Sequence, residues 1–329
     1  MSTTLGSLRR LVMAPSLQEV TLGARGFPGA SSEYAPKLDA IPQSVVCGFE
    51  WGIDSRDQDE IVRRLGFVEP ELRGFAYEGA VMAFTIRDVM GRGTRARDLL
   101  NGPGAEHLFV AYIGIGFAMN HLPRGLWRKV VPDLAGSPYH PTMTWLAVDG
   151  YGFDLAYFHS RKWIDEQRVP PSYPWQGRPD YFPRAIDQGI GRALWFIHGA
   201  QTDEVARAVG RFDPARHADL WSGVGLAATF AGGGTPDELA ALPAAAGEHR
   251  PELALGSVFA VKARVHAGFV PAHSAIAVET FAEITPEAAS ELADATAVAP
   301  DTEGTVPPYE VWRSRIRAHF GAMRTHPAA

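Results

Sequence analysis

Residues 187–233 read DQGIGRALWFIHGAQTDEVARAVGRFDPARHADLWSGVGLAATFAGG and contain one two-part unit and the start of its next copy. The unit opens with a GIG string at 189–191 inside an apolar segment, turns at Gly199 and continues as a charged amphipathic helix. It breaks near Pro214, and the pattern restarts with a GVG string at 223–225. A unit of this size that repeats along a chain is typical of helical arrays.

Glycines recur at matching places in successive apolar segments, at intervals of 31, 37, 36, 39 and 34 residues. They are Gly48, Gly79, Gly116, Gly152, Gly191 and Gly225. A glycine inside a helix costs about 1 kcal/mol relative to alanine, so six of them need a reason. Close helix–helix packing is the favoured interpretation, and close approach to a ligand is the alternative. We predict an all-α protein of tandem helical hairpins, forming a curved α-solenoid or a closed α/α toroid, with a curved or closed form favoured.

The chain divides into three predicted parts. Residues 1–36 form an N-terminal helical extension, in which Ser16 and Glu19 make a capping box that starts a helix. Residues 37–298 form the helical-repeat domain, and 299–329 a C-terminal linker and helix. The proline-rich segment 169–183 is either a lid or a plain connector.

Composition excludes several classes of function. The net charge of −6 gives no basic footprint for nucleic acid. The single cysteine, Cys47, and the absence of ligand spacing among the histidines predict neither a disulfide nor a metal site. No apolar run approaches the roughly 20 residues of a membrane span. No phosphate-binding loop, dinucleotide fingerprint or nucleophile elbow is present. We therefore expect a cytoplasmic protein without a cofactor.

Polar groups inside the apolar helices carry the functional signal. Carboxylates occur near the repeated glycines, and burial of an unpaired carboxylate is costly, so each one pairs, protonates or faces a solvated cavity. Interhelical salt bridges, with basic partners such as Arg216, are one interpretation, and a polar patch in an apolar cavity is the other. On the second interpretation the candidate catalytic residues are Glu50, Glu78, Asp149, Asp154 and His159.

Aromatic residues concentrate in the same helices. Core packing explains most of them, and a subset could line a pocket for a flat or polyunsaturated hydrocarbon. The candidate substrate-binding residues are Trp51, Tyr77, Phe117, Tyr151, Arg192, Trp195 and Trp221.

Four strings, GIGFAMNHLPRGLWRKV, HPTMTWLAVDGYGFDLAYF, DQGIGRALWFIHGA and RHADLWSGVGLAATFAGG, resemble the UnbL-like bacterial family, a domain of unknown function found in enediyne polyketide gene clusters. The similarity extends from about Arg25 to Glu291. After the GYGF string, where that family often has a polar residue, this chain has Asp154. The resemblance implies a biosynthetic role on a hydrophobic, unsaturated intermediate, alongside other proteins of the same gene cluster. It implies no catalytic residues.

Three hypotheses follow. The first is an enzyme that rearranges or cyclises a polyene-like intermediate by acid-assisted chemistry, with an isoprenoid cyclase as a variant. The second is a non-catalytic chaperone that shields a labile polyene. The third is a scaffold for partner proteins. The first is favoured, although the sequence leaves enzymatic activity uncertain.

Overall fold

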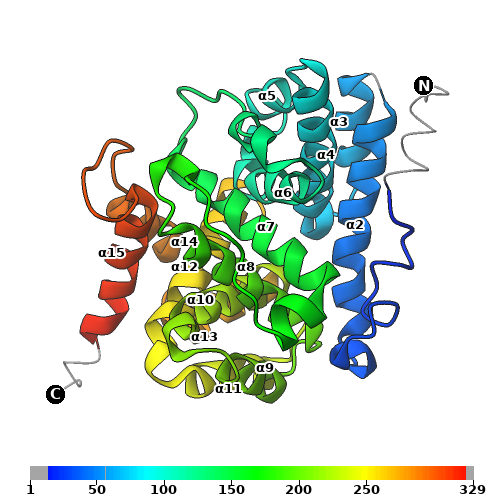
Figure 1. Cartoon of the computed structure of the whole chain (residues 1–329). Helices are drawn as coiled ribbons and strands as arrows, with labels where there is room; N and C mark the ends of the chain where they lie inside the picture. Colours follow the sequence, from blue (N-terminus) through cyan, green and yellow to red (C-terminus); the bar gives the residue numbers. More distant parts are fainter. Residues whose placement is uncertain (1–13, 56, 324–329) are drawn as a thin grey trace.

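The computed structural model describes residues 14–55 and 57–323, and these residues form helices and connecting loops without a β-strand (Figure 1). The all-α prediction is therefore confirmed. The α-helices are α2 Ala35–Asp54, α3 Gln58–Gly66, α4 Pro70–Gly91, α5 Arg95–Leu100, α6 Leu108–Asn120, α7 Trp145–Phe158, α8 Phe182–Ile197, α9 Thr202–Gly210, α10 Pro214–Ala231, α11 Pro236–Ala246, α12 Arg250–His266, α13 Ala272–Ala282, α14 Pro286–Thr296 and α15 Pro308–Met323. The shorter helical turns are η1 Pro28–Ser31, η2 Ala105–His107, η3 Arg124–Lys129, η4 Thr142–Thr144, η5 Arg161–Asp165, η6 Trp175–Gly177 and η7 Gly247–His249.

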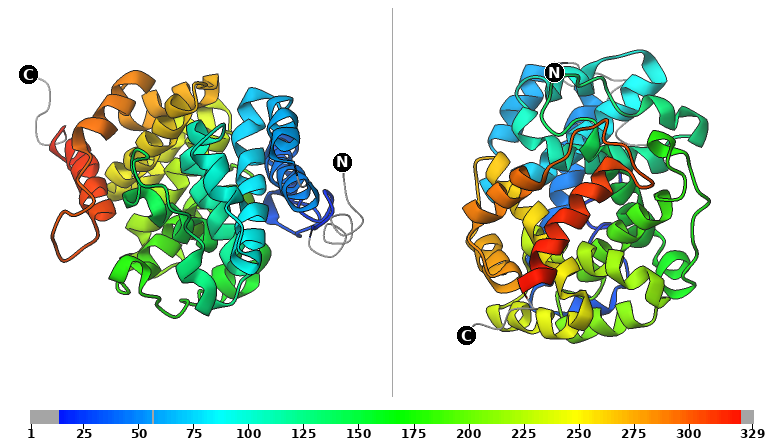
Figure 2. Two further views of the ribbon diagram at one scale, coloured as in Figure 1. Left: turned by 90° about the horizontal axis from the view of Figure 1, so that it is seen from above. Right: turned by 90° about the vertical axis from the view of Figure 1, so that its left-hand side faces the viewer.

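The apolar helices pack side by side in chain order. Helices α2, α4, α6, α7, α8, α10 and α12 form one continuous inner array, in which each member contacts the next. The segments between them include the shorter, more polar helices α3, α9 and α11. In Figure 1 α2 lies on the right of the molecule and α15 on the left, and the right panel of Figure 2 shows α15 lying across that left-hand face.

The repeated glycines are contact points between neighbouring inner helices. A Cβ atom at Gly116 of α6 would overlap the carbonyl oxygen of Ala147 in α7, and one at Gly152 would overlap that of Ile186 in α8. The other four behave alike: Gly48 faces Ala76, Gly79 faces Val45, Gly191 faces Leu220 and Gly225 faces Leu253. The packing interpretation of these glycines is confirmed, because each one meets backbone of the adjacent helix.

A second glycine gives four of these helices a contact on their other side. Two residues before each repeated glycine in α6, α7, α8 and α10, another glycine faces the preceding helix. The pairs are Gly114 with Glu78, Gly150 with Ile113, Gly189 with Asp149 and Gly223 with Gln188. Each G-x-G string is thus a two-sided contact, which explains why the spacing of two residues recurs.

The array curls until its later helices reach its early ones. The Phe230 ring of α10 packs edge to face on Phe75 of α4, with centroids 5.2 Å apart. Arg264 of α12 donates from Nη1 to the carbonyl oxygen of Glu71 in α4 at 2.9 Å. Side chains from α4, α6, α7, α8, α10 and α12 meet at the centre around a void of only about 30 Å³. The centre of the curl is therefore packed, whereas a toroid was expected to enclose a central cavity.

The N-terminal part differs from the predicted helical extension. The capping box forms, since Ser16 N–H donates to Glu19 Oε2 at 2.7 Å and Glu19 N–H donates to Ser16 Oγ at 3.3 Å. The chain then continues as turns instead of a helix, and Gly26 has a left-handed φ of 67°. Leu22 N–H bonds Asp39 of α2 at 2.8 Å, which holds these turns against the array. Residues 1–13 of the predicted extension lie outside the described residues.

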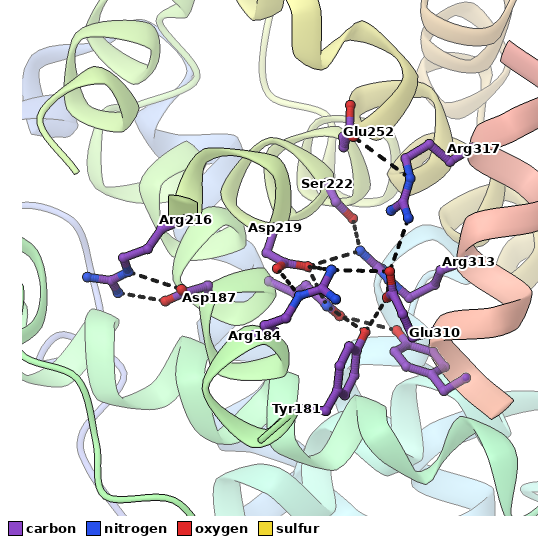
Figure 3. Close-up of polar contacts among 12 residues, drawn as sticks. Tyr181, Arg184, Asp187, Arg216, Asp219, Ser222, Glu252, Glu310, Arg313 and Arg317 are labelled. Atoms are coloured by element: carbon purple, nitrogen blue, oxygen red, sulfur yellow. Dashed lines mark hydrogen bonds and ion pairs between the residues drawn. The ribbon is translucent and has the colours of Figure 1, made fainter. Parts of the chain in front are cut away.

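Helix α15 is held by a buried ionic network (Figure 3). Arg313 pairs with Glu310 at 3.1 Å and with Asp219 of α10 at 3.5 Å, and Arg184 of α8 reaches Glu310 at 3.1 Å. Burial alone would raise the pKa of Glu310, but the positive charges of Arg313 and Arg184 outweigh it and lower the pKa to about 2. The C-terminal helix is thereby tied to two helices of the inner array.

The glycine contacts make a specific prediction about stability. Gly116→Ala places a methyl group against a backbone oxygen that cannot rotate away, so we expect a loss of about 3 kcal/mol or more in the free energy of unfolding, measured by urea denaturation. Gly210→Ala is the matched control, because Gly210 is exposed at the end of α9 with open space around its Cα. The control should be neutral or slightly stabilising. Equal effects of both substitutions would contradict the packing role.

Candidate functional site

A pocket of about 480 Å³ lies beside the packed centre. Its walls come from residues 14–25 and from helices α2, α4, α6, α7 and α8. The wall is mainly apolar and aromatic, as in small-molecule sites generally. The polar and charged residues in its lining are Arg25, Glu78, Asn120, His121, Asp154, Tyr157, His159 and Arg192.

The pocket wall contains a buried carboxylic acid without an ion pair to a described residue. Glu78 of α4 is 2% exposed, and its Oε1 atom has no hydrogen-bond partner. Burial raises the pKa of Glu78 to about 8, although the nearby positive charge of Arg192 opposes the rise. The side chain is therefore mostly protonated at neutral pH and can donate a proton.

An arginine–aspartate pair borders Glu78. Arg192 of α8 donates from Nη1 to Oδ1 of Asp149 in α7, and both side chains are buried. The guanidinium of Arg192 also lies over the Phe153 ring, 5.1 Å from its centroid. Asp149 is not part of the pocket wall itself. Asp149 binds Arg192 and holds it in place, whereas Glu78 is the acid beside this pair that faces the cavity.

A second acid lies further along the wall. Asp154 of α7 is 4% exposed and accepts a hydrogen bond at Oδ2 from the amide of Asn120 in α6. Burial raises the pKa of Asp154 to about 7, against the opposing effects of that hydrogen bond and of the positive charge on Arg25. At neutral pH a large share of Asp154 is therefore protonated.

Apart from Asp54 at the end of α2, the other buried carboxylates among the described residues are paired with arginine. Asp187 binds Arg216 with Oδ1 2.6 Å from Nη2, and Asp219 and Glu310 belong to the α15 network (Figure 3). For these residues the salt-bridge interpretation of the sequence holds. Glu78 and Asp154 differ, because neither has an ion pair with a described residue and both face the pocket. A buried acid that is left unpaired beside a cavity is a candidate functional group.

The structure brings together some of the candidate residues predicted from the sequence. Glu78, Asp154, His159, Phe117 and Arg192 line the pocket, with His159 exposed at its rim. Seven others lie outside the lining: Glu50, Trp51, Tyr77, Asp149, Tyr151, Trp195 and Trp221.

Local packing explains the positions outside the pocket. Phe49 faces the cavity, and the roughly 100° turn per helical residue carries Glu50 and Trp51 to partly open faces of α2. The Tyr77 ring lies 4.1 Å from the ring of His107. Trp195 Nε1 donates to the carbonyl oxygen of Gly232 at 2.7 Å.

Tyr151 and Trp221 are also away from the cavity. The Tyr151 ring packs 4.9 Å from that of Trp127, and Trp221 is buried in α10, a helix that contributes nothing to this pocket. Within the described residues, no group of three His, Cys, Asp or Glu side chains is placed to hold a metal ion.

Sequence reasoning missed four polar residues of the site: Arg25, Asn120, His121 and Tyr157. Asn120 and His121 end the apolar run of α6, so their position after the GIGFAM string was an available signal. Arg25 lies in a segment predicted to be helical and outside the repeats, and nothing in the local pattern connects it with a pocket.

The raised pKa of Glu78 predicts a pH dependence of stability. The pKa of Glu78 is about 8 in the folded state and near 4.5 in the unfolded state. Between these two pKa values the folded state holds a proton that the unfolded state has lost, so the free energy of unfolding falls as pH rises from the lower value to the higher. Between about pH 5.5 and about pH 8 this contribution amounts to roughly 3 kcal/mol. In urea denaturation, the free energy of unfolding of the Glu78→Gln variant should fall by correspondingly less than that of the wild type over the same pH range. Glu248→Gln, whose side chain is 89% exposed, serves as control. If the free energy of unfolding of Glu78→Gln falls with pH as much as that of the wild type, the raised pKa of Glu78 is contradicted.

Comparison with known proteins gives a family but no activity. No curated protein and no solved structure matches the chain. No helix in the described ranges is long and apolar enough to cross a membrane. A family model described as a protein of unknown function, DUF1702, matches residues 4–320, which is nearly the full length. The chain therefore belongs to the DUF1702 family of proteins of unknown function.

Proposed function

We propose that this protein binds a hydrophobic, unsaturated small molecule in the pocket and rearranges or cyclises it by acid-assisted chemistry. The observation that carries the proposal is Glu78, a protonated carboxylic acid without an ion pair in the wall of an apolar pocket. An acid of this kind can transfer its proton to an electron-rich double bond. The pocket volume of about 480 Å³ is in the range of small-molecule sites.

The chemistry balances without an oxidant or reductant. The Glu78 proton forms a new C–H bond at one end of a double bond, and the positive charge develops at the other end. A neighbouring double bond of the ligand can then attack this cation and close a ring, which moves the positive charge to another carbon. With or without ring closure, a different C–H bond next to the cation finally breaks: its electrons form a double bond, and its proton goes to the Glu78 carboxylate, which restores the acid. The rings of Phe117 and Phe153, whose centroids are 5.8 Å apart, lie in the pocket wall, where aromatic rings can stabilise developing positive charge.

The biological context of the proposal is natural-product biosynthesis. It rests on the resemblance of four strings of the chain to the UnbL-like family of enediyne gene clusters. A polyene-like intermediate agrees with the apolar, aromatic wall of the pocket. Other biosynthetic proteins of the same cluster are the proposed partners.

The proposal is tested with extracts of a native host from which the gene has been deleted. We expect purified wild-type protein to convert an apolar compound that accumulates in the extract, as followed by liquid chromatography and mass spectrometry. Glu78→Gln should bind the same compound and convert it roughly 100-fold or more slowly, because the acid is lost while the pocket remains. Glu248→Gln should retain wild-type conversion.

Three other outcomes separate the alternatives. Stoichiometric binding by the wild type without conversion would identify a chaperone for a labile polyene. Conversion of an isoprenoid diphosphate would identify an isoprenoid cyclase. If no small molecule binds and partner proteins are captured instead, the scaffold hypothesis replaces the proposal.

A further inference from the structure

The mouth of the pocket contains an arginine whose charge is not neutralised. Arg25 comes from the turns at residues 14–27 and lines the cavity. Its Nη2 atom donates to the carbonyl oxygen of Phe158 at 2.6 Å, and the guanidinium lies 5.1 Å from the centroid of the Phe158 ring. These contacts fix the side chain without supplying a negative charge. Among the described residues, no carboxylate lies within ion-pair distance of Arg25, and its Nε atom is buried without a partner.

Two acids lie near Arg25, and neither forms an ion pair with it. Asp39 of α2 accepts the N–H of Leu22 at 2.8 Å, and its charge and that of Arg25 both act on Tyr157. The nearest acid of the lining, Asp154, is close enough for Arg25 to lower its pKa, yet burial keeps that pKa near 7. His121 and His159 are exposed lining residues and are not anions at any pH. A guanidinium that is partly shielded from water and lacks a counter-ion is a ready site for an anion.

We infer that the ligand is an amphiphile with a carboxylate head, which pairs with Arg25 at the mouth while the apolar chain extends over Phe117 and Phe153 towards Glu78. This inference rests on the proposed function, because it assumes that the pocket binds a small molecule. It adds to the proposed function the chemical class of the ligand and the orientation of the ligand in the pocket. The reacting double bond is then away from the carboxylate, since Glu78 is 2% exposed whereas Arg25 is partly exposed.

The dimensions and chemistry of the pocket agree with such a ligand. At the packing density of protein interiors, about 480 Å³ accommodates on the order of twenty non-hydrogen atoms, the size of a long-chain acid. Asp154, where protonated, can donate a hydrogen bond to the same carboxylate. The wall between the two ends holds Ile41, Val45, Val46 and Phe49, which suit a hydrocarbon chain.

The test uses cis-parinaric acid, a linear polyene fatty acid whose fluorescence rises in apolar surroundings, and its methyl ester. The wild-type protein should bind the acid about tenfold more tightly than the ester, because the ester lacks the charge that pairs with Arg25. Arg25→Gln should lose this preference by weakening binding of the acid alone, and Arg25→Lys should retain part of it.

Arg124→Gln is the matched control. Arg124 also donates to backbone carbonyl oxygens, those of Pro171 and Ser172 at 3.0 and 2.9 Å, but it lies outside the pocket lining. This variant should keep the tenfold preference. Circular dichroism and thermal melting of each variant establish that it is folded.

The remaining outcomes separate the two proposals. Equal binding of acid and ester by the wild type, or equal weakening of both in Arg25→Gln, would overturn the carboxylate head group while leaving an apolar binding pocket. Binding of neither probe to the folded wild-type protein would overturn both the head group and the proposed pocket function.

Discussion

The structure depends on direct contact between the backbones of successive inner helices. At each contact a glycine lies against a carbonyl oxygen of the neighbouring helix, as Gly116 does against Ala147, so no side chain separates the two chains. The G-x-G strings extend this contact to both neighbours of a helix. Because glycine is costly in a helix, the array is stable only if packing at these points offsets that cost. The contact also fixes the rotation of each helix about its axis, and thereby decides which residues face the interior of the curl.

The location of the pocket follows from this arrangement. Six inner helices meet closely enough to leave a void of about 30 Å³ at their centre. Towards α2 the space is wider, and it is bounded by the turns that precede η1 instead of by another pair of tightly packed helices. Arg192 and Phe196 of α8 line both spaces, which shows that the pocket is a continuation of the core interior. Its apolar wall is continuous with the surface that elsewhere forms the core, and this explains why aromatic residues occur in both.

The sequence predicted the architecture better than the site. The glycine interval and the G-x-G strings predicted the all-α array and the helix-to-helix role of the glycines, because these signals repeat and are local. Whether a residue belongs to the site depends on which face of its helix points into the pocket. A shift of one residue along the helix is enough to move a side chain from the pocket wall to another face. Phe49 lines the pocket whereas Glu50 and Trp51 do not, although all three belong to one string. Arg25 reaches the site from a non-repeating segment through its contact with Phe158, a contact over 133 residues that no local pattern contains.

The buried carboxylates separate into two kinds according to what surrounds them. Glu310 contacts Arg184 of α8 as well as Arg313 of its own helix, and these positive charges keep the acid ionised, so that it joins α15 to the inner array. Where the neighbour is a cavity, as for Glu78, no contact compensates the loss of hydration, and the protonated form is the stable one. Stability alone would favour an apolar residue at position 78, since the acid adds desolvation cost without a pairing gain. The presence of an unpaired acid there is therefore better explained by a function of the pocket than by the requirements of the fold.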